Sequence, residues 1–368
     1  MYIVIVLRVL TPLQFICTPP QPSTALPSTF PCMVLGYIVL LTTVHTLQCR
    51  YTRHVLTIEG TPAAELDTVG TFAFQKQLWL CMAAAALKVK SQVETYRGAN
   101  IFGLLVWQLN EIWPTGGWGS LEYGYPTADG SQVLGGRWKP LHYLYSRSLY
   151  ADVMATCGIG GTCYVKNDRA GLAFNGTVTL EALSFVDGGV TEVHVEHVNL
   201  GVGAGTSTYF NVNASIANIS RAHHMLIATV RDGRNRVRSR ERARTREENS
   251  GGSRFEDGSI LAVNEIALVP PKDMQLPAAK VTVRLPDDVD KVQGSSTPNA
   301  DGTYNVLVEA NATALYVTVT ARAHGRFSDN FFAMQSGEKR TLKFIPFPLF
   351  NVSMLASSLR VEHLQMYL

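Results

Sequence analysis

Apolar side chains recur at helical spacing between residues 71 and 97. The positions that step by three or four are Phe74, Leu78, Met82, Ala85, Val89 and Val93. Such a step places side chains on one face of an α-helix. The alanines at 83–86 have the highest helix propensity, and Gly98 supplies a stop signal. The pattern therefore predicts one helix over residues 71–97.

Residues 101–109 (IFGLLVWQL) form a nearly continuous apolar run with turn signals on both sides. A strand that is covered on both faces has such a run instead of an alternation. We therefore expect a buried strand here, followed by a loop that begins at Asn110.

From about residue 163 the apolar period changes to two, which is typical of β-strands. Six short strand candidates precede a boundary marked by Pro270, Pro271 and Pro277, and four more follow from about residue 280. Several strands at this spacing predict immunoglobulin-like sandwiches. The ten segments are CYVKN, TVTLEALSF, TEVHVEHVNL, STYFNV, HHMLIATVRD, VNEIALV, KVTVRL, TYNVLVEA, ALYVTVTARA and KRTLKFIPF.

Two segments do not fit this picture. Residues 1–65 combine a Pro/Ser/Thr-rich stretch with an apolar run at 32–47 that is short for a membrane span. We interpret them as a disordered or mis-predicted leader, with a real anchor as the alternative, and expect no stable membrane span. Residues 231–248 hold eight arginines. Their composition predicts a disordered insert at 231–258, and the absence of interleaved aromatics argues against nucleic-acid binding.

The composition of the 368-residue chain is that of a globular protein with room for two or three domains. The hydrophobic fraction is 46%, the charged fraction 17% and the net charge +3, which indicates no acidic partner. The six cysteines form no zinc pattern. For Cys157 and Cys163 two ordinary thiols are the favoured interpretation, and a small disulfide loop in an oxidising compartment is the alternative.

Three of the five tryptophans, Trp107, Trp113 and Trp118, lie within twelve residues at the end of the predicted buried strand. Aromatic rings can stack on the apolar face of a pyranose while nearby polar groups orient its hydroxyls. A sugar site is one interpretation of this cluster. A packed core strand with an aromatic-rich turn is the other.

The runs WQLNEIW, GWGSLEYG and GRWKPLHY resemble, in order and spacing, the end of the catalytic barrel of β-mannosidases in glycoside hydrolase family 2, and GRFSDNFFAM resembles their last domain. The likeness extends from about residue 69 to 347. It implies that 71–97 is the seventh barrel helix, 101–109 the eighth strand and 138–153 the eighth helix. The expected fold is mixed: an incomplete (β/α)8 barrel piece at 66–155, a sandwich at 156–277, a second sandwich at 278–347 and a tail at 348–368.

The resemblance also implies a chemistry. Retaining glycosidases use two carboxylates roughly 5–5.5 Å apart, and in this family both are glutamates on strands upstream of the seventh helix. We therefore expect no catalytic residue in this chain, and do not assign Glu59, Glu65 or Glu111 as one. Trp107, Asn110 and Glu111 are the expected substrate-binding residues, with no metal or cofactor. The implied partner is a β-mannoside oligosaccharide or a glycoprotein glycan.

Two functions remain open from sequence. The chain is the C-terminal part of a β-mannosidase, or it is a non-catalytic β-sandwich that binds carbohydrate or protein. Five Asn-x-Ser/Thr sequons, together with the resemblance, favour a lysosomal or secretory location.

Overall fold

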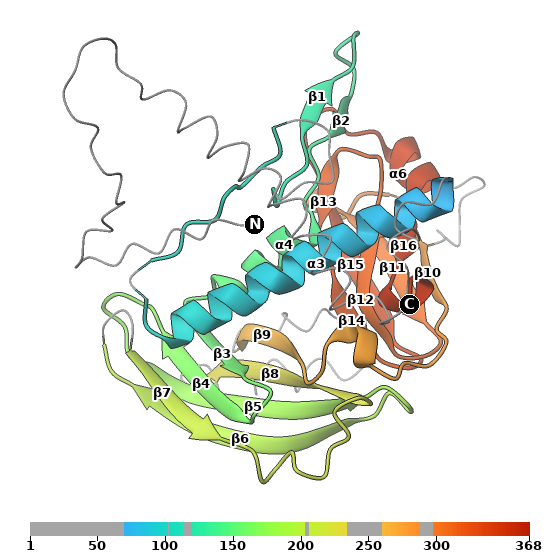
Figure 1. Cartoon of the computed structure of the whole chain (residues 1–368). Helices are drawn as coiled ribbons and strands as arrows, with labels where there is room; N and C mark the ends of the chain where they lie inside the picture. The colour runs from blue at the N-terminus through green and yellow to red at the C-terminus, as the bar shows by residue number, and fades with distance from the viewer. Residues whose placement is uncertain (1–69, 102, 113–118, 203–205, 234–259, 287–296) are drawn as a thin grey trace, which may run out of the picture.

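A long helix lies across two β-sandwiches in the computed structural model (Figure 1). The leader at 1–65 and most of the insert at 231–258 fall outside the residues that the structure describes. The described residues are 70–101, 103–112, 119–202, 206–233, 260–286 and 297–368.

The predicted helix is confirmed as α3 (Thr71–Gly98). Its buried side chains differ from the predicted face, because Phe74 is 60% exposed while Trp79 is 1% exposed. Before Trp79 the helix is only partly covered: the Phe72 ring lies 5.9 Å from that of Tyr367, and the fully buried side chains begin at Trp79. At its end, a Cβ on Gly98 would lie 2.8 Å from the ring of Tyr164, so glycine permits this close approach.

Among the described residues, the first sandwich has seven strands in two antiparallel sheets, ordered β3-β4-β7 and β6-β5-β8-β9. Val165, Val178 and Val230 belong to the apolar cluster that its strands bury. All six predicted strands form, and β3 is an additional one. The bounds are β3 (Val153–Cys157), β4 (Thr162–Asn167), β5 (Phe174–Ser184), β6 (Val190–Leu200), β7 (Thr206–Asn211), β8 (His224–Asp232) and β9 (Ile260–Ala267).

The second sandwich repeats this plan, with sheets ordered β10-β11-β15-β13 and β14-β12-β16. Alternate residues of β11 are buried, as expected for a strand with one face on a core. The bounds are β10 (Val281–Arg284), β11 (Tyr304–Ala310), β12 (Ala314–Thr320), β13 (Gly325–Phe327), β14 (Phe332–Met334), β15 (Lys339–Pro346) and β16 (Arg360–Glu362).

The helix α3 binds both sandwiches through its two halves. Trp79 donates its indole N–H to Thr318 Oγ1 at 3.2 Å in the second sandwich. Arg97 pairs with Asp168 at 2.6 Å beside the first sandwich, and Tyr164 donates to the Glu94 carbonyl at 2.5 Å. One apolar cluster accordingly holds residues of α3 and of both sandwiches.

The expected strand at 101–109 does not form. Leu105, Trp107 and Leu109 are 56%, 48% and 56% exposed, whereas Leu104 and Val106 pack against the core. A buried parallel strand needs hydrogen-bonded neighbours on its edges and a second covered face. Within the described residues no strand of a sheet pairs with residues 101–109. The segment bends at Trp107 and Leu109 and leaves Leu105, Trp107 and Leu109 exposed to solvent.

Two other boundaries differ from the sequence analysis. The helix expected at 138–153 is shorter: α4 (Pro140–Leu144) continues as the π-helical turn η1 (Tyr145–Leu149), and β3 then begins. The expected tail at 348–368 is folded onto the protein. It contains α6 (Val352–Ser358), β16 and the short helix η4 (Leu364–Met366), and β16 pairs with β12.

Cys157 and Cys163 form a disulfide between β3 and β4. The favoured interpretation of two free thiols was therefore wrong. The turn between these strands makes the two cysteines direct cross-strand partners, a proximity that their spacing alone did not establish. Among the described residues, no helix is long and apolar enough to cross a membrane.

Candidate functional site

The sequence runs that carry the family resemblance lie against one another. The Leu109 carbonyl accepts from the Ser120 N–H at 2.8 Å and from the Leu121 N–H at 3.0 Å. The Glu111 N–H donates to the Leu121 carbonyl at 2.9 Å, and the Lys139 N–H donates to the Ser120 carbonyl at 2.9 Å. The three runs therefore form one hydrogen-bonded unit, although residues 113–118 lie outside the described part.

Gly119 allows the first two runs to meet. A Cβ at this position would lie 2.5 Å from the Asn110 carbonyl carbon and 2.5 Å from the Glu111 nitrogen. Such a distance is far below van der Waals contact, so only glycine lets the two backbones approach this closely. The adjacent Ser120 is fully buried, and its hydroxyl donates to the Leu109 carbonyl at 2.8 Å.

Glu111 forms a buried ion pair with Lys139. The two side chains are only 3% and 5% exposed. Loss of either partner would leave a buried unpaired charge, which costs several kcal/mol. The pair therefore holds the end of the 101–112 segment against the third run. The Glu111 carboxylate, one of the expected substrate-binding groups, is already paired with Lys139.

The third run also holds the unit to the second sandwich. Arg137 pairs with Glu122 through two bonds of 2.6 and 3.0 Å and donates to the Ala321 carbonyl at 3.0 Å. The Arg326 guanidinium lies 4.5 Å from the centre of the Trp138 ring, within cation–π range. The 101–112 segment is thus tied to the second sandwich through residues 119–138.

The three expected substrate-binding residues do not share one surface. Trp107 is 48% exposed and Asn110 is also exposed, whereas Glu111 is buried. The Asn110 amide nitrogen donates to the Glu111 carbonyl at 3.0 Å. Trp107 and Asn110 therefore face solvent near the end of the 101–112 segment, and Glu111 points into the protein.

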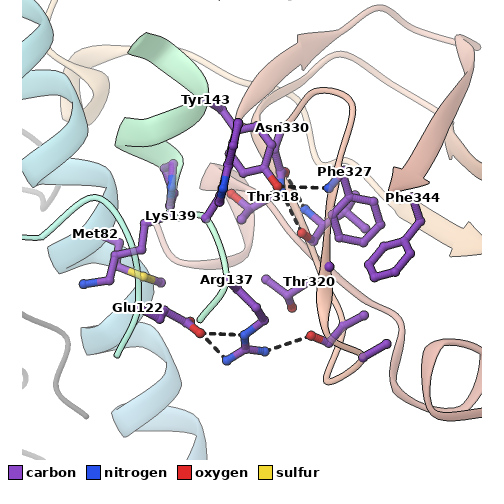
Figure 2. A pocket seen from close by; sticks show the side chains of 16 residues that line it. Met82, Glu122, Arg137, Lys139, Tyr143, Thr318, Thr320, Phe327, Asn330 and Phe344 are labelled. Atoms are coloured by element: carbon purple, nitrogen blue, oxygen red, sulfur yellow. Dashed lines mark hydrogen bonds and ion pairs between the residues drawn. The ribbon is translucent and has the colours of Figure 1, made fainter. Parts of the chain in front are cut away.

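A small cavity of about 40 Å³ is lined by residues of α3, of the third run and of the second sandwich (Figure 2). Met82, Lys139 and Asn330 are among its lining residues. Tyr143 accepts from the Phe327 N–H at 3.1 Å, and burial raises the pKa of this phenol to about 12. Sugar-binding pockets are about ten times larger, so this cavity has room for water only.

A larger hollow of about 810 Å³ lies between α3 and the first sandwich. Its lining includes Lys90, Glu94 and Thr156, and the Thr156 hydroxyl has no hydrogen-bond partner among the described residues. Neither cavity is lined by Trp107, Asn110 or Glu111. Of the three candidate residues, Trp107 and Asn110 are thus exposed outside these two cavities, and Glu111 is buried.

Sequence reasoning missed the residues that position this segment, namely Ser120, Arg137 and Lys139. The signal available was the presence of charged residues inside apolar, aromatic runs, since buried charges require partners. In the part of the chain that the structure describes, no cluster of three or more potential metal ligands is present.

Comparison with known proteins identifies the second sandwich. A family model for the Ig-fold domain of mannosidases matches residues 277–366, which includes most of the segment first taken as a tail. The second sandwich is therefore similar to the immunoglobulin-like domain of mannosidases.

Two relatives that are similar in sequence to part of this chain are also β-mannosidases. The chain is 34% identical over 90 residues to β-mannosidase from Bos taurus, which covers 22% of this chain and 9% of that protein. It is 33% identical over 100 residues to β-mannosidase A from Aspergillus oryzae, which covers 25% of this chain and 9% of that protein. The match thus spans less than a tenth of each curated relative.

A solved structure extends the likeness in fold. The β-D-mannosidase of Dictyoglomus thermophilum superposes with a TM-score of 0.52 and 18% identity, over 80% of this chain and 30% of that one. This chain resembles the C-terminal part of glycoside hydrolase family 2 β-mannosidases.

Proposed function

We propose that this chain is the C-terminal part of a β-mannosidase, a retaining exo-glycosidase that hydrolyses terminal β-D-mannose residues from oligosaccharides or glycoprotein glycans. The observation that carries the proposal is the mannosidase Ig-fold domain at 277–366. The hydrogen-bonded unit formed by the three runs supports it further, because these runs are similar to the end of the family's barrel.

In this proposal residues 70–149 supply the closing wall of a (β/α)8 barrel. Leu105, Trp107 and Leu109 are alternate residues of the 101–112 segment, and their apolar side chains are exposed. That arrangement suits a strand whose neighbours are supplied by an upstream part of the protein. Active sites of such barrels lie at the carboxyl ends of the strands, which is where Trp107 and Asn110 occur in the segment.

Each candidate residue then has a distinct role. Trp107 stacks on the sugar, and Asn110 lies beside it as a polar contact. Glu111 is a positioning residue, because its carboxylate is already paired with Lys139 and is only 3% exposed. A general acid must reach the glycosidic oxygen, so the catalytic acid and the nucleophile are assigned to the upstream part.

The alternative function is a non-catalytic module that binds carbohydrate or protein through its sandwiches. The observation in its favour is that each sandwich has seven paired strands in the part of the chain that the structure describes, while neither family glutamate is recognised in this chain. Restoration of activity by an upstream barrel half separates the two functions, since a binding module has no reason to complete a foreign active site.

The test is reconstitution. The full chain is co-expressed with the upstream part of a β-mannosidase that ends before its seventh barrel helix, and hydrolysis of an aryl β-mannoside is measured. We expect activity that requires both parts. Trp107→Ala in this complex should lower kcat/KM by about tenfold, equivalent to about 1.4 kcal/mol of transition-state binding.

Leu172→Ala is the matched control, because Leu172 is 51% exposed in a loop of the first sandwich. This variant should retain kcat/KM within about twofold. A stable complex of the two parts without turnover would contradict the proposal, and an unchanged kcat/KM for Trp107→Ala would remove the ring from the sugar site.

A further inference from the structure

The five sequon asparagines share one structural property, which is exposure to solvent. The structure places them at the start of β5, in the turns that follow β7, in the connection between β11 and β12, and at the cap of α6. These positions lie on both sandwiches. The five residues are Asn175, Asn213, Asn218, Asn311 and Asn351.

In two of these asparagines the side-chain oxygen accepts a hydrogen bond, while the side-chain nitrogen remains available for a bond to a sugar. Asn311 Oδ1 accepts from the Lys280 N–H at 2.7 Å. Asn351 Oδ1 accepts from the Met354 N–H at 3.2 Å and caps α6. Both contacts use the amide oxygen, so a bond from Nδ2 to a sugar would leave them intact.

An independent feature points to the cellular compartment in which such a modification occurs. Cys157 and Cys163 form a disulfide in the first sandwich, which is the sandwich that carries Asn175, Asn213 and Asn218. Structural disulfides form and persist in secretory and other oxidising compartments. Asparagine-linked glycans are likewise found on proteins of the secretory route.

The distribution of sequons is uneven. The sequence contains none between residues 70 and 149. That region carries the exposed apolar side chains of Phe72, Phe74, Leu105, Trp107 and Leu109. A glycan there would obstruct packing of another protein part, whereas glycans on the sandwiches leave this surface clear.

We propose that Asn175, Asn213, Asn218, Asn311 and Asn351 are N-glycosylation sites, and that the protein folds in an oxidising secretory compartment with glycans on both sandwiches. The inference does not depend on the proposed glycosidase activity. The donor class is an oligosaccharide on a polyprenyl pyrophosphate. The bond from sugar C1 to the phosphate oxygen breaks, a bond from C1 to Asn Nδ2 forms, the amide loses a proton to a base of the transferase, and the lipid pyrophosphate leaves.

Two of the sequon hydroxyls are buried, which determines whether a glycan must be attached before or after folding. Thr177 and Thr313, the third residues of the Asn175 and Asn311 sequons, are 9% and 1% exposed. Thr177 also lies in β5, which is paired on both sides. A transferase that must engage this hydroxyl cannot reach it in the folded protein, so these two sites require attachment before folding.

The primary experiment uses the protein purified from its own cells. Peptides are treated with a glycan-releasing amidase in ¹⁸O-water, which converts each formerly glycosylated asparagine to ¹⁸O-labelled aspartate, and are then analysed by mass spectrometry. Label at a majority of the five sites supports the proposal. Label at none or at a minority of them overturns it.

A second experiment tests the individual assignments in secreted full-length protein. Each Asn→Gln variant should lose one glycan by gel mobility, while Asn199→Gln, an exposed asparagine outside any sequon, should lose none. The secreted, glycosylated protein should contain the Cys157–Cys163 disulfide and no labelling of these cysteines by a thiol reagent. If the glycosylated protein aggregated and Cys157 and Cys163 were both reduced, the proposal that the glycans lie on folded, oxidised sandwiches would be contradicted.

Discussion

Replacing Arg147 with methionine should destabilise the whole chain, because this guanidinium joins its three parts. Arg147 lies in the η1 turn, and its nitrogens are 3.6 Å from Glu265 of β9 and 3.4 Å from Asp329 of the second sandwich. It also donates to the Phe331 carbonyl at 3.0 Å. Burial alone would lower the pKa of Arg147, but Glu265 and Asp329 outweigh this effect and raise the pKa, so the group stays charged.

The magnitude follows from burial. The side chains of Arg147 and Glu265 are 5% and 6% exposed, and that of Asp329 is 14% exposed. Removing one partner of a buried ion pair leaves an uncompensated charge and costs about 3–5 kcal/mol. The unfolding entropy of a chain of this length corresponds to about 1.5–2 °C per kcal/mol, so the midpoint of thermal unfolding should fall by about 5–10 °C.

Arg284→Met is the matched control. Arg284 is 47% exposed and lies 3.8 Å from Glu309, and exposed pairs of this kind contribute about 0–1 kcal/mol. Both variants are compared by circular dichroism during heating. Adding Glu265→Gln and Asp329→Asn to Arg147→Met should recover part of the loss, because it removes the stranded charges. A midpoint for Arg147→Met within about 2 °C of the control would refute the reasoning.

Two further predictions concern the disulfide and the half-buried His142. Replacing Cys157 and Cys163 by serine should cost about 2 kcal/mol from the entropy of closing a short loop, and an unchanged unfolding midpoint would contradict this. Burial, and then the charge of Arg326, lower the pKa of His142 below 6.5. The unfolded chain therefore binds the proton more readily, so stability should fall as the pH drops below about 6.5 towards the folded-state value. His142→Asn should flatten this dependence, whereas the exposed control His197→Asn should leave its slope unchanged.

Local patterns predicted the elements that depend on local chemistry. The helix at 71–98 follows from its alanines and its glycine stop. The alternation of apolar and polar residues located ten of the fourteen sandwich strands in the described part of the chain. The buried face of the helix was predicted less well, because Phe74 has helical spacing but is exposed, whereas Trp79, outside the predicted face, is buried.

Other features depend on partners distant in sequence and could not be predicted locally. The apolar run at 101–109 has the composition of a buried strand, yet burial requires neighbouring strands that the described chain does not provide. The pair between Glu111 and Lys139 forms only because Gly119 lets two backbone segments meet. Likewise, Tyr367 contacts Trp79 at a ring distance of 5.4 Å, so the last residues belong to the core and not to a tail.

The most direct measurement is hydrolysis of an aryl β-mannoside by the purified full chain, alone and after co-expression with an upstream barrel half. The account predicts no turnover by the chain alone, since one unpaired segment cannot hold two carboxylates at a fixed separation, and turnover by the complex. Turnover by the chain alone that survives purification and disappears on Glu59→Gln, Glu65→Gln or Glu111→Gln would contradict it, because the catalytic carboxylate would then lie within this chain.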